Sequence, residues 1–194
     1  LPSIRAGTLT PTLMGLIKKV RKTGFTIAPE AGSQRLRDVI NKNIRFEEIE
    51  ATVRDAFSLG WQVIKLYFMI GLPSETDADL DAIAEMVTAL KKIKPGKRRG
   101  QINVSVTTFI PKAHTPFQWA AQISQEEAWA RLERIKSKLR IPGVQVKWQH
   151  PAMSQLEGAI ARGDRRIAGV IEQAWRLGCT FDGWSDHFDF DRWQ

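Results

Sequence analysis

Cysteine is almost absent from this 194-residue chain, which holds one, Cys179. A lone cysteine forms neither an internal disulfide nor a cysteine-based metal site, and such scarcity is typical of proteins kept in a reducing compartment. Long apolar runs are lacking too, since none approaches the roughly 18–20 residues that a membrane span requires. No His, Asp and Glu residues have the spacing of a metal site. The sequence therefore predicts a cytoplasmic protein with no membrane contact and no metal ligands of its own.

Other recognisable motifs are missing as well. No glycine-rich dinucleotide fingerprint follows an expected strand, which argues against a nicotinamide-binding Rossmann fold. No serine or cysteine nucleophile motif is present. The N-terminus has neither an initiator methionine nor the form of a signal peptide, so we expect the sequence to begin within a longer protein.

Positive charge is in excess. The chain has 29 Lys and Arg against 21 Asp and Glu, for a formal net charge of +8. Such a balance suits an anionic partner, for example a phosphate-bearing cofactor or RNA.

Strand-like and helix-like segments alternate through residues 1–118. The strand-like runs are Ser3–Ala6, Gly24–Ala28, Gln62–Ile70 and Gln101–Ile110, with helical patterns between them. The last two runs are nearly continuously apolar, so we expect them to be buried on both faces of a parallel sheet. This repetition predicts an α/β fold, either part of a (β/α) barrel or an open doubly wound sheet.

Residues 119–194 have a different character. They contain expected helices and one short strand, at Ser124–Leu139, Val144–Trp148, Met153–Ala161 and Arg165–Leu177. The tail from Cys179 onward is rich in Trp, Phe, His and Asp, which is too aromatic for a disordered segment. We expect a helical, aromatic-rich extension that packs on the first unit.

Four loops follow the expected strands and should share one rim. They span residues 7–10, 29–33, 70–76 and 109–117. The carboxyl ends of parallel strands are where barrel and open-sheet enzymes hold ligands. Gly71 would let the backbone approach a ligand closely, although ordinary strand-to-helix turn chemistry explains this loop equally well.

Glu30 stands between a strand and a short amphipathic helix. A carboxylate at a strand end is costly unless it is hydrogen-bonded or meets a ligand, and two ribose hydroxyls would satisfy it. The alternatives are a helix N-cap role for Glu30 or Ser33, and a simple helix-end cation for Lys42. The expected apolar side of this helix consists of Leu36, Val39 and Ile40.

Three motifs, taken in order, resemble the second half of the radical SAM barrel. They are Ala28-Pro29-Glu30-Ala31-Gly32-Ser33 with Lys42 twelve residues after Glu30, then Phe68-Met69-Ile70-Gly71-Leu72-Pro73-Ser74-Glu75-Thr76, then Phe109-Ile110-Pro111-Lys112-Ala113-His114-Thr115-Pro116. The resemblance implies a partial (β/α) barrel, an incomplete TIM-like fold whose second half occupies residues 1–118. The run Arg162–Arg166 and the tail Phe181–Trp184 resemble a subfamily that often carries a cobalamin-binding-like domain before the barrel.

The resemblance also implies an activity. Members bind S-adenosylmethionine and a 4Fe–4S cluster, and the full-length protein would generate a 5′-deoxyadenosyl radical that acts on an unknown substrate. The family holds its cluster with three cysteines spaced Cys-x3-Cys-x2-Cys, which this chain lacks. The cluster ligands are therefore expected outside this chain, and the chain alone should be inactive. Cobalamin in the full-length protein is left open.

The first site residues implied by the resemblance lie on the expected fourth and fifth barrel strands. Glu30 and Ser33 match the position that meets the ribose and methionine parts of the cofactor. Lys42 matches a basic position that contacts the cofactor or the substrate. Lys65 and Tyr67 lie where other members often place an aspartate, which puts that contact in doubt.

The remaining implied site residues follow the last two strands. Gly71 lines the backbone path beside the cofactor, while Phe109, Ile110 and Pro111 match the segment that holds adenine. No catalytic residue is implied. The missing front half, or another copy of the chain, is expected to cover the exposed edge of the sheet.

Two other interpretations stay open at this point. One is a non-catalytic basic α/β module that binds RNA or a protein partner, with Arg162, Arg165 and Arg166 on the phosphates. The other is a small barrel hydrolase that uses Glu30 and Glu75, which requires two carboxylates about 5–10 Å apart.

Overall fold

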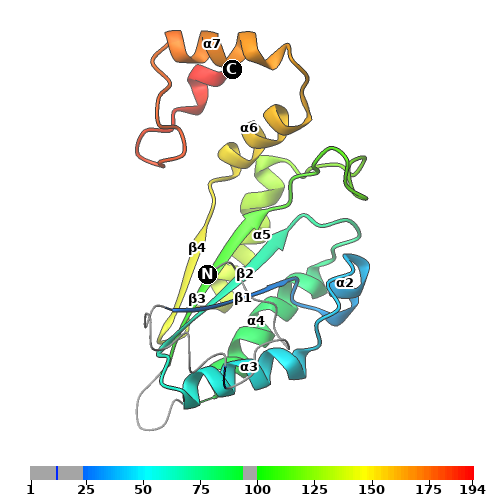
Figure 1. The fold of residues 1–194 in the computed structure, drawn as a ribbon, viewed down its shortest axis with the longest axis vertical. Coiled ribbons are helices and arrows are strands. Elements are labelled where there is room, and N and C mark those ends of the chain that lie inside the picture. The colour runs from blue at the N-terminus through cyan, green and yellow to red at the C-terminus, as the bar shows by residue number, and fades with distance from the viewer. Residues whose placement is uncertain (1–11, 13–23, 94–99) are drawn as a thin grey trace.

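The computed structural model describes residue 12, residues 24–93 and residues 100–194 (Figure 1). The expected strand Ser3–Ala6, the loop 7–10 and nearly all of the helical pattern expected between this strand and Gly24 lie outside these residues. The elements in chain order are β1 Phe25–Glu30, α2 Gln34–Val39, α3 Phe46–Ser58, β2 Val63–Ile70, α4 Asp77–Lys91, β3 Gln101–Thr108, α5 Gln125–Lys138, β4 Val144–Trp148, α6 Pro151–Arg162, α7 Ile167–Arg176 and the 3-10 helix η1 Phe190–Trp193.

The strands form one parallel sheet in the order β1-β2-β3-β4. β2 and β3 pair along their whole length, so that Ile70 lies opposite Thr108. Within the described part of the chain the sheet does not close, and β1 and β4 are its two edges. The predicted α/β fold with a partial barrel-like parallel sheet is therefore confirmed.

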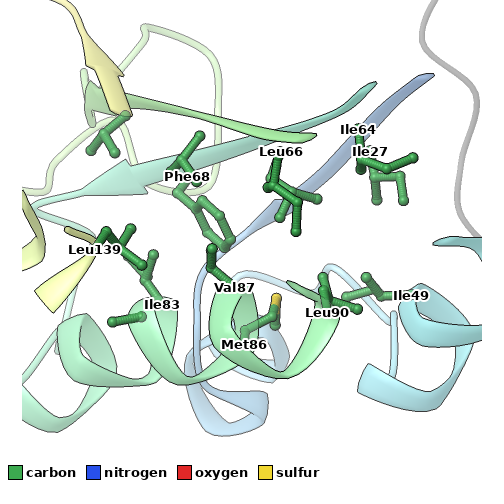
Figure 2. Close-up of a cluster of buried hydrophobic side chains, with 14 of the residues drawn as sticks. Ile27, Ile49, Ile64, Leu66, Phe68, Ile83, Met86, Val87, Leu90 and Leu139 are labelled. Atoms are coloured by element: carbon green, nitrogen blue, oxygen red, sulfur yellow. The ribbon is translucent and has the colours of Figure 1, made fainter. Parts of the chain in front are cut away.

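The core lies between one face of the sheet and helices α3, α4 and α5 (Figure 2). Leu66 and Phe68 of β2 are at most 1% exposed and pack with Ile83 and Val87 of α4. Each large apolar side chain buried in this way contributes about 1.5–3 kcal/mol. The sequence predicts these buried faces from apolar residues at helical spacing, and they are buried as expected: Ile49, Val53 and Phe57 of α3, and Leu80, Ile83, Val87 and Leu90 of α4.

The other face of the sheet is polar, and here the sequence-based expectation is wrong. Lys65 and Ser105 are only half-buried, and Tyr67 and Lys147 are exposed, in regular alternation with the core residues. In the described ranges α3, α4 and α5 pack on one face of the sheet through a single core cluster. The long apolar runs concealed this alternation, so β2 and β3 are not buried on both faces.

The segment after β4 contacts the sheet through α6. This helix contacts α5 and β3, whereas α7 lies against η1 at the end of the molecule farthest from α3 (Figure 1). Ala174 is the buried residue of α7, while Trp175 and Trp184 are more than 60% exposed. The division of the chain at residue 118 stays a prediction. In the ranges that the structure describes, no helix is both long enough and apolar enough to cross a bilayer.

Candidate functional site

The carboxyl ends of β1, β2 and β3 meet at one edge of the sheet. The N–H of Phe109 donates to the carbonyl of Ile70 at 2.8 Å, and Glu30 ends β1 opposite Phe68 of β2. The loops that begin at Glu30, Gly71 and Phe109 therefore form a common rim, as the sequence predicted.

Glu30 has an unusual backbone conformation at this rim. Its φ is 69°, and the pairing of β1 with β2 is irregular between Ile27 and Glu30. Holding a non-glycine residue in the left-handed region costs about 1 kcal/mol or more, and such strain clusters at functional sites. The Glu30 carboxylate accepts a hydrogen bond from Lys42 Nζ at 3.1 Å, and a quarter of its side chain is exposed. Lys42 is thus the partner of the Glu30 carboxylate, and the N-cap of the following helix is Ser33 rather than Glu30.

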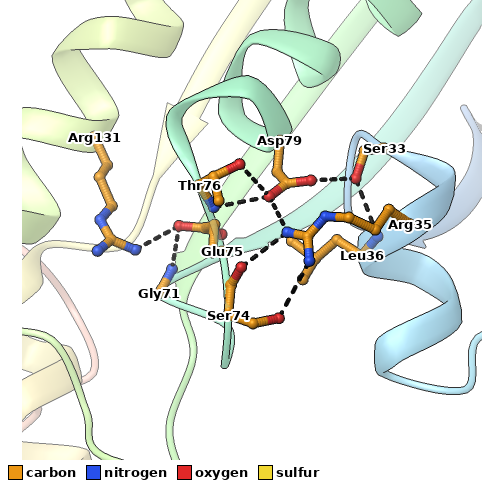
Figure 3. Close-up of polar contacts among 9 residues, drawn as sticks. All are labelled: Ser33, Arg35, Leu36, Gly71, Ser74, Glu75, Thr76, Asp79 and Arg131. Atoms are coloured by element: carbon orange, nitrogen blue, oxygen red, sulfur yellow. Dashed lines mark hydrogen bonds and ion pairs between the residues drawn. The ribbon is translucent and has the colours of Figure 1, made fainter.

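Ser33 fixes the turn after β1. Its Oγ is the N-cap of α2, accepting from the Leu36 N–H at 3.1 Å, and it donates to Asp79 at 2.5 Å (Figure 3). Asp79 also accepts from Thr76 at the start of α4 and from the Arg35 guanidinium. Burial raises the pKa of Asp79, but the hydrogen bonds from Arg35, Ser33 and Thr76 outweigh it and hold this pKa well below its usual range.

A buried ion pair fixes the loop after β2. The Glu75 side chain is 2% exposed and accepts from the Gly71 N–H at 2.9 Å and from Arg131 of α5 at 2.6 Å (Figure 3). Burial raises the pKa of Glu75, and the contacts with Gly71 and Arg131 offset part of this rise. Gly71 has a φ of 81°, and a side chain there would meet Ile123 at 2.8 Å. The Glu75 carboxylate is therefore committed to holding this loop.

Arg37 is the functional-site residue that sequence reasoning missed. It is 2% exposed and donates to the carbonyls of Ala31 at 3.0 Å, Gly32 at 2.7 Å and Ile44 at 2.9 Å. Burial lowers the pKa of Arg37. The expectation that Val39 lies on the buried side of α2 is wrong, because Val39 is 42% exposed and Arg37 lies inside. Apolar spacing cannot reveal a buried cation whose role is to satisfy backbone carbonyls.

The loop after β3 supplies an apolar surface beside these charges. Phe109 is 9% exposed and packs edge to face on Phe117, with ring centroids 6.1 Å apart. It clusters with Ala31 and Leu72, which follow β1 and β2. Pro111 is buried and Ile110 is half-buried.

The structure thus brings most of the predicted site residues together. Glu30, Lys42, Gly71 and the segment Phe109–Pro111 lie along the rim, whereas the Ser33 hydroxyl is engaged with Asp79. Lys65 and Tyr67 lie within β2, before its carboxyl end, and on its polar face, with Tyr67 opposite Ser105 of β3. Their roles toward a cofactor stay predictions.

An iron–sulfur cluster does not fit the residues of this chain. In the part of the chain that the structure describes, no three His, Cys, Asp or Glu residues are grouped so that they could hold a metal ion. The single cysteine of the sequence, Cys179, is buried beyond α7. Three thiolate ligands are therefore not available here.

Comparison with known proteins connects this rim to a family. Residues 3–87 match the model of the radical SAM superfamily. A relative, uncharacterized protein MJ0966 of Methanocaldococcus jannaschii, is 35% identical over 170 residues, which cover 88% of this chain and 36% of the relative. The chain thus spans about a third of the length of that protein. Through residues 3–87, the chain is similar to the radical SAM superfamily.

Proposed function

We propose that this chain supplies the adenosyl-binding rim of a radical SAM enzyme. The match of residues 3–87 to the radical SAM superfamily supports a radical SAM-type function, and the rim is the site that we propose for it. When bound, S-adenosylmethionine together with a 4Fe–4S cluster would supply the radical chemistry that removes a hydrogen atom from the substrate. The residues of this chain would bind and orient the adenosyl group and exclude water from it.

The conformation of Glu30 carries this proposal. Its strained backbone presents a partly exposed carboxylate at the rim, held in place by Lys42 at 3.1 Å. A carboxylate in this position can accept hydrogen bonds from both hydroxyls of a ribose. Lys42 orients the carboxylate from one side and leaves its other oxygen for a ligand.

The neighbouring residues suit the other parts of an adenosyl ligand. The apolar surface of Phe109 and Ile110 lies at the end of the adjacent strands and can pack against adenine. The Ser33 hydroxyl donates its hydrogen to Asp79 and accepts a hydrogen bond from the Leu36 N–H. One lone pair of its oxygen is left to accept a hydrogen bond from a ligand. The Gly71 N–H is bonded to Glu75, so Gly71 contributes its backbone surface rather than a donor.

The cluster belongs to residues outside this chain in our proposal, because the chain has a single cysteine. The 194-residue chain alone is then expected not to cleave S-adenosylmethionine. Anaerobic reconstitution of a longer protein that includes a three-cysteine segment should yield 5′-deoxyadenosine. A radical-dependent product from this chain alone would contradict the assignment.

The binding role can be tested without the cluster, since 5′-methylthioadenosine carries the ribose and the adenine but needs no iron. Calorimetry should detect its binding to the chain, and Glu30→Gln should weaken it by about tenfold or more, because each charge-assisted hydrogen bond contributes about 1.5–3 kcal/mol. The matched control is Glu85→Gln, which removes the same charge from an exposed site on α4. Equal binding by both variants would remove Glu30 from the site.

RNA binding is a second candidate, favoured by the exposed end of the molecule. Arg162, Arg165 and Arg166 are exposed between α6 and α7, and Trp175 of α7 is 63% exposed. Arginines and exposed aromatic rings together suit phosphates and unstacked bases. Affinity for tRNA should then fall steeply with salt, and Arg165→Ala should lower the slope of log K against log salt by roughly 0.7–0.9. Lys92→Ala, at the C-cap of α4, is the control.

A further inference from the structure

We infer that the substrate of this site carries an anionic oxygen group, of phosphate or carboxylate type, which binds to the polar face of the sheet. This polar face is defined by five side chains that alternate with the core: Lys65 and Tyr67 of β2, Ser105 and Thr107 of β3, and Lys147 of β4. The inference rests on the proposed function, because it assigns a substrate class to the sheet whose rim would hold the adenosyl group.

The register of the strands places three of these side chains in one row. Tyr67 lies opposite Ser105, and Ser105 lies opposite Lys147. Adjacent strands are about 4.8 Å apart, so the row spans roughly 10 Å. Lys65 lies two residues before Tyr67 on the same face, which places it about 7 Å away along the strand. Two ammonium groups and two hydroxyls thus project from one patch of the sheet.

These groups have no other protein partner in the described parts of the chain. No hydrogen bond or ion pair joins the side chain of Lys65, Tyr67 or Lys147 to another described residue, whereas Lys42, Lys112 and Lys136 each meet a carboxylate. Tyr67 is 40% exposed, and the ring stands on the strand rather than in the core. The polar face therefore presents donors that the described part of the fold does not use.

The charge of this face is of one sign. No Asp or Glu occurs on β2, β3 or β4, and the carboxylate of Glu30 at the end of β1 is paired with Lys42. Ammonium groups and hydroxyl donors match the oxygens of a phosphate or a carboxylate. A cationic group would be repelled there, and an apolar group would leave the donors without acceptors.

The position of the row also orients the substrate. Tyr67 and Ser105 lie two residues before Met69 and Thr107 on their strands, and therefore farther from the rim at the carboxyl ends. A substrate anchored by its anionic group at this row would extend toward the carboxyl ends of the strands. Its reactive part would then lie near the rim where we place the adenosyl group.

Tyr67 provides a direct probe, because it is the single tyrosine of the chain. With tyrosine labelled with 13C at Cζ, the protein gives one such signal, which can be followed while inorganic pyrophosphate is added at constant ionic strength. The inference predicts a saturable shift of this signal. Lys65→Ala and Lys147→Ala should each weaken binding by about tenfold, as expected for the loss of a charge-assisted hydrogen bond. Lys92→Ala removes the same charge from the C-cap of α4 and should leave binding unchanged.

Citrate and sodium chloride are the comparison arms of this experiment. Tighter binding of pyrophosphate identifies a phosphate site, and tighter binding of citrate a carboxylate site. An equal shift with sodium chloride, or equal affinity of Lys147→Ala and Lys92→Ala, overturns the inference. Thermal unfolding of each variant verifies that the fold is retained.

Titration with 5′-methylthioadenosine separates the two proposals. If it binds while pyrophosphate leaves the Tyr67 signal unmoved, the anion site is refuted and the adenosyl rim stands. If pyrophosphate binds in a lysine-dependent manner and 5′-methylthioadenosine does not bind at all, the adenosyl rim is refuted and the anion site loses its assignment to a radical SAM substrate.

Discussion

Single buried charges hold the rim in shape. Asp79 collects hydrogen bonds from both α2 and the start of α4, Arg37 satisfies the carbonyls after β1, and Glu75 ties the loop after β2 to Arg131. Removing one partner of such a group leaves the others buried and unpaired, which is more costly than losing an exposed contact. The rim is therefore specified by a few polar residues.

Asp79→Asn should destabilise the protein by about 2–3 kcal/mol at neutral pH, because the amide cannot accept all of these hydrogen bonds. The pKa of Asp79 in the folded chain lies below its value of about 3.9 in the unfolded chain. The stabilisation by Asp79 is then complete above about pH 5 and is lost as the pH falls below about 4. Urea unfolding at pH 7, 5 and 3 should show the difference between wild type and variant narrowing at acid pH. A constant difference would contradict this, and the exposed Asp186→Asn is the control.

Successive side chains of the central strands β2 and β3 point alternately into the core and onto the polar face. On β2, Leu66 packs into the core, while the next residue, Tyr67, faces away from the helices. Because the side-chain period of a strand is two, one element serves both the core and the polar face. The stability of the sheet and the chemistry of its polar face are thus carried by alternate residues.

Leu66→Ala should cost about 2–5 kcal/mol in the free energy of unfolding, because it leaves a cavity in a closely packed core. Tyr67→Ala should cost about 1 kcal/mol or less, as expected for an exposed strand position. Chemical denaturation of both variants measures the contrast. Similar losses for the two would mean that something covers the polar face.

In the described ranges the sheet ends in two edge strands. β1 pairs with β2 and β4 pairs with β3, and no other described strand pairs with their outer edges. Open edges favour pairing with another strand. We therefore propose that an additional half-barrel, or a second copy of the chain, covers one of them.

The isolated 194-residue chain should then associate in solution. Multi-angle light scattering at rising protein concentration is expected to show a mass above the 22.0 kDa of one chain. A constant mass of one chain over the whole range would argue against an uncovered edge. Substitution of Thr26 on β1 by proline, which blocks strand pairing, would reveal whether that edge is the one used.

Much of the fold and the position of the rim could be read from the sequence. Apolar spacing located α3, α4 and their buried residues, and the order of the motifs placed Glu30, Gly71 and Phe109 at one edge. Spacing failed at Val39 and Arg37, because the burial of a cation depends on carbonyls brought close by the turn. It also failed on the polar face of β2 and β3.

By itself the sequence determined most helices and strands, the parallel sheet and the resemblance to a family, since periodicity, turn residues and motifs act over short stretches of chain. The tertiary structure alone decided which side chains are engaged. Lys42 bonds to Glu30, Ser33 bonds to Asp79, and Tyr67, Ser105 and Lys147 lie in one row. Each of these arrangements joins separate segments of the chain through strand register or helix packing. Such contacts depend on distances in space, which local sequence does not encode.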